Sequence, residues 1–193
     1  MFEMTGNIFD LAFNSPGPNI LLIMTNGCWT SKGDAVMGRG IAKAAKELFP
    51  DCSKTLGTFL RLHYEHFKDY PGSEEGEPWN VPYKIGMHGD THVFSFPTKP
   101  TKVTVTKTSI LPRFFSERQM GMRIDGWKGF SLLPLIERSA KFIASLVGEK
   151  PSFLERVFLP RVGTLNGGLE WDDVREVLEK YFNDDRYIVV ERG

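Results

Sequence analysis

A short apolar run near the N-terminus is the feature that most constrains the fold of this chain. Residues 19–25 read NILLIMT. An apolar run of this length without alternation is typical of a central strand that is buried on both faces of its sheet. The run therefore predicts the centre of a sheet that is covered on both sides.

The rest of the chain alternates between strand-like and helix-like segments. Further strands are predicted at residues 1–9, 156–160 and 186–190, with a hairpin at 84–96 that turns at Gly89-Asp90. Helices are predicted at residues 41–49, 51–67, 131–147 and 171–182. Residues 70–83 are rich in Pro, Gly and Glu and are expected to form a surface loop. This order predicts an α/β fold, a three-layer α/β/α sandwich around a central mixed sheet.

Composition limits the classes of function. The 193 residues suit a single domain, and 24 basic and 24 acidic residues give a formal net charge of zero, so a polyanion would need a local patch. Two cysteines form no CxxC pair, and the four histidines have no metal-ligand spacing. No segment is apolar enough to span a bilayer, and no signal peptide is indicated. We therefore expect a cytoplasmic monomer that needs no metal or cofactor and has no membrane partner.

Two glycine-rich loops each join a predicted strand to a predicted helix. Loop one contains GDAVMGRGIA at residues 33–42, and loop two is PRVGTLNGGL at residues 160–169. Glycines there let backbone N–H groups approach an anion, and a helix start adds a favourable dipole. Two such loops at the carboxyl ends of neighbouring strands could hold a diphosphate. The alternative is that these glycines only make tight turns.

Several motifs resemble the macro-domain family. Asn26 followed by GRGIA at 38–42 is similar to the first loop of that family, and GTLNGGLEW at 163–171 to its diphosphate loop. FPTK at 96–99 resembles the branch containing the antitoxin that removes ADP-ribose from thymidine in DNA, and Trp127-Lys128 with Ser131 resembles the stretch that follows it. The resemblance spans nearly the whole of residues 1–193 and implies one macro domain that binds ADP-ribose.

The resemblance also implies roles for individual residues. Asn7 and Ile8 would border the adenine, and Asn26 would hydrogen-bond or position the distal ribose as a catalytic residue. The two loops and the end of the FPTK strand would line the ligand. The implied ADP-ribose contacts are Asn7, Ile8, Asn26, Met37, Gly38, Arg39, Gly40, Ile41, Thr98, Pro160, Val162, Gly163, Thr164, Leu165, Asn166, Gly167, Gly168 and Leu169.

Lys99, the last residue of FPTK, would be the central catalytic residue. A neutral amine could attack the anomeric carbon of ADP-ribose, which is a masked aldehyde, and form a Schiff-base-type intermediate. A charged lysine could instead stabilise the leaving group. The alternative to both roles is a solvated lysine that follows a strand.

An insertion separates Lys99 from Trp127. That branch of the family places the two motifs close together, whereas here residues 100–126 intervene. The insertion is basic and aromatic through Lys102, Lys107, Arg113, Phe114, Phe115, Arg118 and Arg123. Basic residues interleaved with aromatic ones suit single-stranded DNA, whose bases stack while its phosphates are neutralised. A solvated hairpin that covers the sheet edge is the alternative.

The leading functional prediction is an ADP-ribosyl hydrolase that acts on ADP-ribose attached to DNA or protein. One alternative is a reader that binds ADP-ribose without turnover. The other is a phosphatase that acts on ADP-ribose 1″-phosphate. The sequence alone leaves these three open.

Overall fold

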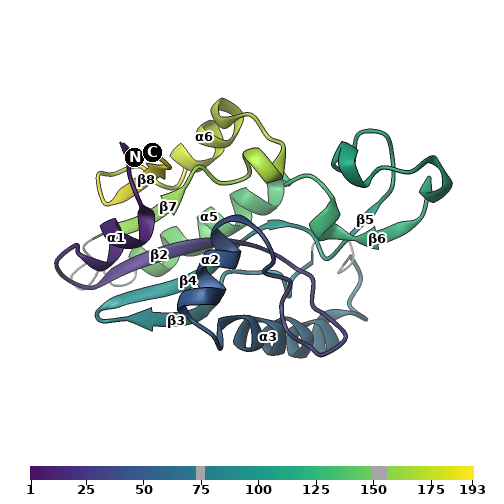
Figure 1. Ribbon diagram of the computed structural model, residues 1–193, viewed down its shortest axis with the longest axis horizontal. Coiled ribbons are helices and arrows are strands. Elements are labelled where there is room, and N and C mark those ends of the chain that lie inside the picture. The colour runs from purple at the N-terminus through teal and green to yellow at the C-terminus, as the bar shows by residue number, and fades with distance from the viewer. Residues whose placement is uncertain (73–76, 149–155) are drawn as a thin grey trace.

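The computed structural model describes residues 1–72, 77–148 and 156–193. Its six-stranded sheet has the order β1-β8-β7-β2-β4-β3 (Figure 1). Neighbouring strands run parallel except β3 and β4, which pair antiparallel, so the predicted mixed sheet is confirmed. The strands are β1 (Phe2–Thr5), β2 (Asn19–Asn26), β3 (Lys84–His88), β4 (Thr91–Lys99), β7 (Arg156–Pro160) and β8 (Tyr187–Glu191).

Strand β2 lies inside the sheet, between β4 and β7. Its side chains alternate between two cores because successive residues of a strand point to opposite faces. Leu21 and Ile23 pack into one core, and Ile20 and Leu22 into the other. The apolar run is therefore unbroken because both faces of β2 are buried, as the sequence predicted.

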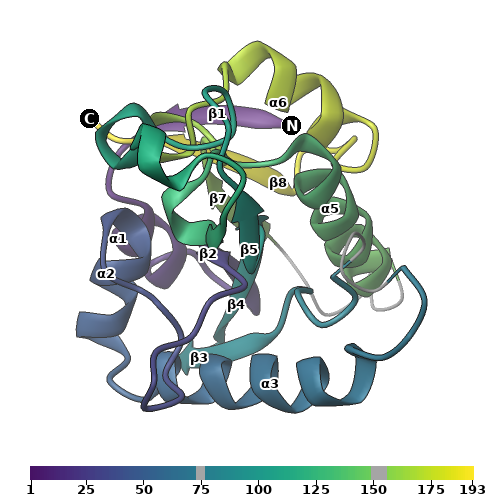
Figure 2. The same ribbon diagram turned by 90° about the vertical axis from the view of Figure 1, so that its right-hand side faces the viewer.

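Helices cover both faces of the sheet, as predicted (Figure 2). Helices α1 (Ile8–Phe13), α2 (Gly40–Leu48) and α3 (Cys52–Phe67) supply apolar side chains to the core that contains Leu21. Helices α5 (Leu133–Gly148) and α6 (Trp171–Glu179) supply the opposite core. The three-layer sandwich is confirmed. No helix within the described ranges combines the length and hydropathy needed to cross a bilayer.

Two sequence predictions were wrong. Residues 1–9 do not form one strand, because β1 ends at Thr5 and Asn7 caps helix α1, its Oδ1 accepting the Phe9 N–H at 3.0 Å. The segment 70–83 is not wholly a surface loop, because Glu77, Trp79 and Asn80 are buried. Polar composition concealed this, since the carboxylate and amide there are hydrogen-bonded inside the protein.

The insertion forms a small substructure of its own (Figure 1). Strands β5 (Lys102–Thr104) and β6 (Arg123–Asp125) pair antiparallel at its base. Short 3₁₀ turns lie between the two strands at Pro112–Phe114 and Glu117–Gln119, and a third follows β6 at Gly126–Lys128. The paired strands return the chain to Gly126 beside the point where it left the sheet, and this places the insertion next to the two glycine loops.

Candidate functional site

The candidate site lies where the parallel strands β2, β4 and β7 end. Because these strands are neighbours in the sheet, their following loops meet at one edge. Asn26 and Lys99 are register partners at the ends of β2 and β4, beside a local irregularity between Thr25 and Asn26. The two predicted catalytic residues therefore lie side by side.

Lys99 Nζ is surrounded by backbone carbonyl oxygens. It donates to Asn166 O at 2.7 Å, to Gly129 O at 2.8 Å and to Trp127 O at 3.4 Å. Burial, with smaller contributions from the nearby guanidinium groups of Arg113 and Arg39, lowers the pKa of Lys99 from 10.5 to about 8. The carbonyls accept from the ammonium form and oppose that loss of charge. Near neutral pH the side chain is therefore mostly a protonated donor that joins loop two to residues 127–129.

Loop two presents backbone donors to the site. Within the residues that the structure describes, the amides of Gly163, Leu165 and Asn166 have no backbone acceptor outside the helices and strands. Leu165 lies at φ 48 and is 93 % exposed, an uncommon conformation for a leucine. Successive backbone N–H groups in such a turn suit an anion. Strained residues of this kind cluster at ligand sites.

The other loop-two glycines are explained by packing. A Cβ on Gly168 would lie 2.1 Å from the Phe130 ring, and one on Gly167 would lie 2.5 Å from Ser131 Oγ. Gly163 and Gly168 also have φ of 73°. The tight-turn alternative therefore accounts for these glycines, and their side-chain space is not open to a ligand.

Loop one differs from loop two, because packing does not explain its glycine at position 38. A Cβ on Gly38 would meet no atom within 4 Å, and the backbone there is not in the left-handed region. No side chain caps the first turn of helix α2, whose amides follow Gly38 and Arg39. The absence of a side chain at Gly38 thus has no packing explanation, whereas close approach of an anion to the helix start would explain it.

Asn26 holds loop one in shape. Its Nδ2 donates to Val36 O at 2.9 Å, and its Oδ1 accepts the Cys28 N–H at 2.9 Å. Both ends of the amide are therefore engaged within the loop. The geometry gives Asn26 a positioning role, and the sequence-based expectation of direct ribose contact stays a prediction.

Several predicted contact residues direct their side chains away from the site. Met37 and Val162 are buried, Leu169 packs against the core of helices α5 and α6, and Thr98 Oγ1 donates to Thr25 O at 3.4 Å. The contact of these residues with a ligand stays a prediction. The remaining predicted residues lie at the same edge of the sheet or in its loops: Arg39, Gly40, Ile41, Pro160 and Thr164.

Asn7 and Ile8 follow strand β1, which is parallel to β8, so they also lie at the carboxyl edge of the sheet. Ile8 packs into the core beneath helix α1. Asn7 uses one lone pair of Oδ1 as the helix cap, and its Nδ2 and the second lone pair of Oδ1 are left for other partners.

The insertion contacts both glycine loops, which the sequence did not indicate. Arg113 Nη2 donates to Asn166 Oδ1 at 3.0 Å. The Phe114 ring lies between the guanidinium of Arg113, 5.0 Å from its centroid, and that of Arg39, at 5.6 Å. Trp127 meets the same ring edge-on at 5.2 Å between centroids. The insertion thus bridges loop one and loop two above Lys99.

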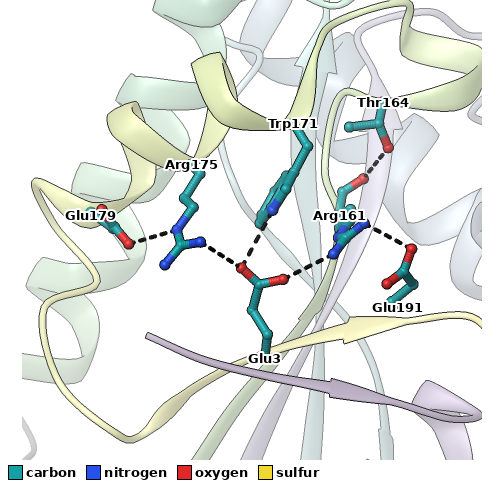
Figure 3. Close-up of polar contacts among 7 residues, drawn as sticks. All are labelled: Glu3, Arg161, Thr164, Trp171, Arg175, Glu179 and Glu191. Carbon is teal, nitrogen blue, oxygen red and sulfur yellow. Dashed lines mark hydrogen bonds and ion pairs between the residues drawn. The ribbon is translucent and has the colours of Figure 1, made fainter.

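A network of ion pairs fixes the start of loop two (Figure 3). Arg161 bonds Glu3 at 3.1 Å and Glu191 at 2.7 Å. Arg175 approaches the other oxygen of Glu3 at 3.3 Å, and Thr164 Oγ1 donates to Arg161 O at 2.8 Å. Two carboxylates therefore neutralise Arg161, so it anchors the loop to the sheet edge and is not a free cation for a ligand.

Cys28 also lies at this edge of the sheet, in loop one. Burial raises the pKa of the Cys28 thiol to about 12, and its Sγ donates to Thr101 O at 3.0 Å. Among the described residues, no group of three or more His, Cys, Asp or Glu side chains could hold a metal ion. The catalytic role of Lys99 stays a prediction.

Comparison with known proteins gives structural likeness without close sequence similarity. No family model matches the chain, and no curated protein matches it. The macrodomain of Mycobacterium tuberculosis DarG aligns with 100 % of this chain and 97 % of its own, with a TM-score of 0.59 and 20 % identity. The macrodomain of Thermus aquaticus DarG aligns over the same shares, with a TM-score of 0.59 and 19 % identity.

A third solved structure, Thermosipho africanus DarTG in complex with ADP-ribose, aligns with 94 % of this chain and 39 % of its own, with a TM-score of 0.57 and 20 % identity. At these identities the likeness concerns the fold. The order of the strands, the helical layers and these alignments agree. The chain therefore has the macro domain fold.

Proposed function

We propose that this chain binds ADP-ribose along the carboxyl edge of its sheet and hydrolyses the bond between the distal ribose and an attached group. The observation that carries the proposal is the position of Lys99. Its ammonium lies between the two glycine loops and contacts loop two directly. The DarTG structure, solved with ADP-ribose, supports the same class of ligand.

In this proposal each of the two loops supplies backbone donors to the diphosphate. Loop two offers the amides of Gly163, Leu165 and Asn166, and loop one offers the start of helix α2 beside the open position at Gly38. Backbone N–H donors and a helix N-terminus both favour a negative group. If a diphosphate lies between the loops, the distal ribose would lie close to Lys99.

In the proposed reaction, Lys99 acts as a protonated donor. A water oxygen forms a bond to the anomeric carbon while the bond to the departing nucleobase or side chain breaks. For this, Lys99 Nζ would exchange its longest contact, with Trp127 O at 3.4 Å, for a contact with the departing atom. The departing group takes the electron pair of that bond and a proton from the Lys99 ammonium, and the water proton returns to the amine through solvent. Three carbonyl acceptors and a pKa of about 8 favour this role over attack by a neutral amine.

The substrate class that we favour is ADP-ribosylated thymidine in single-stranded DNA. The FPTK motif at 96–99 carries the resemblance to that branch. The insertion adds exposed basic residues beside Met120 and Met122, which are also exposed. Phosphates and bases of a single strand suit such a surface.

A reader that binds without turnover is the second candidate. The observation that favours it is the same set of carbonyl contacts, because an ammonium with three acceptors also serves as a structural tie between loop two and residues 127–129. Turnover would then be absent although binding is intact.

Calorimetry with ADP-ribose, followed by incubation with three substrates, tests the proposal. The substrates are a thymidine-ADP-ribosylated oligonucleotide, a glutamate-ADP-ribosylated protein and ADP-ribose 1″-phosphate. The proposal expects binding and release of ADP-ribose from the oligonucleotide. Binding without any release supports the reader, and phosphate release from the third substrate supports the phosphatase. Absence of ADP-ribose binding would contradict the proposal altogether.

A further inference from the structure

A buried carboxylate lies behind Lys99, outside the two glycine loops. Glu77 is 6 % exposed. Its two oxygens accept the Thr101 N–H at 2.8 and 2.9 Å, and Oε2 also accepts from Asn80 Nδ2 at 3.0 Å and from Thr101 Oγ1 at 3.3 Å. No sequence pattern indicates this cluster, because Glu77 follows a run of polar, loop-forming residues.

The cluster holds the chain on both sides of Pro100. Asn80 Nδ2, which contacts Glu77, also donates to Lys99 O at 3.0 Å. Glu77 itself binds Thr101, two residues further on. The backbone that carries the Lys99 side chain out of strand β4 is therefore held at residue 99 and at residue 101.

Thr101 links the same carboxylate to the acceptors of Lys99. The Gly126 N–H donates to Thr101 O at 2.9 Å. A Cβ on Gly126 would lie 2.0 Å from Pro100 O, so the two segments are in close contact. Trp127 and Gly129, one and three residues after Gly126, supply two of the three carbonyls that accept from Lys99 Nζ. One carboxylate thus orders both the lysine and most of its acceptors.

The arrangement has a cost that fold stability alone does not explain. Burial raises the pKa of Glu77, and its backbone lies at φ 43, which is uncommon for a residue other than glycine. Arg138 of helix α5 secures the turn by donating to Glu77 O at 3.0 Å and to Asn80 O at 2.8 Å. Strained, buried polar groups held in this way are typical of functional sites.

We propose that Glu77 is a positioning residue for Lys99, which acts through Asn80 and Thr101 to set where the ammonium lies. Its effect on turnover rests on the proposed hydrolase function. Its effect on the position of Nζ does not, and this separates the two tests.

The test measures the protonation midpoint of Lys99 by NMR in protein with isotope-labelled lysine, with the signal assigned through Lys99→Arg. In Glu77→Gln one acceptor becomes a donor that faces the Thr101 N–H. The lysine should then relax towards solvent, and its midpoint should rise from about 8 towards the ordinary value of 10.5. Asp184→Asn is the control, since that carboxylate also accepts a backbone N–H, from Arg186 at 2.9 Å. In Asp184→Asn the protonation midpoint of Lys99 should stay unchanged.

A folded Glu77→Gln protein with an unchanged Lys99 midpoint would overturn the proposal, because the carboxylate would then support only the fold. If Glu77→Gln does not fold, Asn80→Ala removes the link to Lys99 O and leaves the Glu77 contact with Thr101. The same rise is expected there, and an unchanged midpoint contradicts the proposal equally.

A second arm adds turnover. If the wild type hydrolyses the oligonucleotide, Glu77→Gln should lower kcat and leave the Kd for ADP-ribose within about twofold. A loss of affinity with kcat unchanged would contradict a positioning role. If the wild type shows no turnover, the proposed function fails, and the Lys99 midpoint still decides the inference.

Discussion

Lys99 sets the chemistry of the site at the scale of a single residue. Its pKa is lowered from 10.5 to about 8, so the ammonium is present at lower pH and is lost as pH rises through 8. If the ammonium donates the proton, kcat/KM should be level near pH 7 and fall about tenfold per pH unit above 8. A pH profile of wild-type hydrolysis measures this.

The neutral-amine mechanism predicts the opposite profile. Its rate would rise through pH 8, and borohydride would trap a covalent adduct of Lys99 with the ribose, because it reduces a Schiff base. Either result would replace the donor role that we assign to this lysine.

Arg113 is the neighbouring charge that most lowers the pKa of Lys99. In Arg113→Ala that repulsion is absent, so the Lys99 midpoint and the alkaline limb of the pH profile should both move to higher pH. Arg118→Ala, an exposed arginine of the same insertion, is the matched control. An unmoved limb in Arg113→Ala would show that burial alone determines the pKa.

At the scale of elements, the two glycine loops should respond differently to an added methyl group. Gly38→Ala meets open space, so we expect an unchanged Tm and ADP-ribose affinity lowered at least about tenfold if a phosphate approaches there. Gly168→Ala would clash with Phe130 at a φ of 73° and should lower the free energy of unfolding by about 1–3 kcal/mol. Thermal denaturation and calorimetry on both variants check this. Normal affinity in Gly38→Ala would remove loop one from the binding site.

The insertion carries exposed basic residues that can be replaced while its buried side chains, Val105, Ile110 and Leu111, stay in place. Lys107 and Arg118 are both exposed. The double variant Lys107→Ala/Arg118→Ala removes two positive charges and leaves Arg113 and Phe114 beside the site. Activity on ADP-ribosylated single-stranded DNA should fall more than the affinity for free ADP-ribose. Equal losses in the two assays, or none in either, would contradict a nucleic-acid role.

Sequence predicted those elements whose character is local. The run at 19–25 and the hairpin at 84–96 carry their own apolar pattern and turn residues, and both formed as expected. Helix α1 was not predicted, because a segment of six residues is too short to show a clear helical period. The contacts of Arg113 with Asn166, and of Glu77 with Thr101, join positions far apart in the chain, and no local pattern reports them. The single domain, the monomeric state and the DNA partner stay predictions.

At the scale of the whole molecule, the sheet order brings the site together. Strands β4, β2 and β7 are adjacent, so loops that follow residues 99, 26 and 160 meet although they are distant in sequence. The Arg161 network with Glu3 and Glu191 ties loop two to the edge strand β1 and its neighbour β8 (Figure 3). The chain is neutral overall, so anion binding depends on this local convergence of donors.

The most direct test of the central claim is the single-turnover rate of Lys99→Ala on the thymidine-ADP-ribosylated oligonucleotide, measured with the affinity of the same protein for ADP-ribose. Lys180→Ala, an exposed lysine after helix α6, is the control. We predict that Lys99→Ala binds ADP-ribose nearly as well as wild type and cleaves at least about 100-fold more slowly. Cleavage at the wild-type rate by Lys99→Ala would contradict the account, because the ammonium at the meeting point of the loops would then have no part in the reaction.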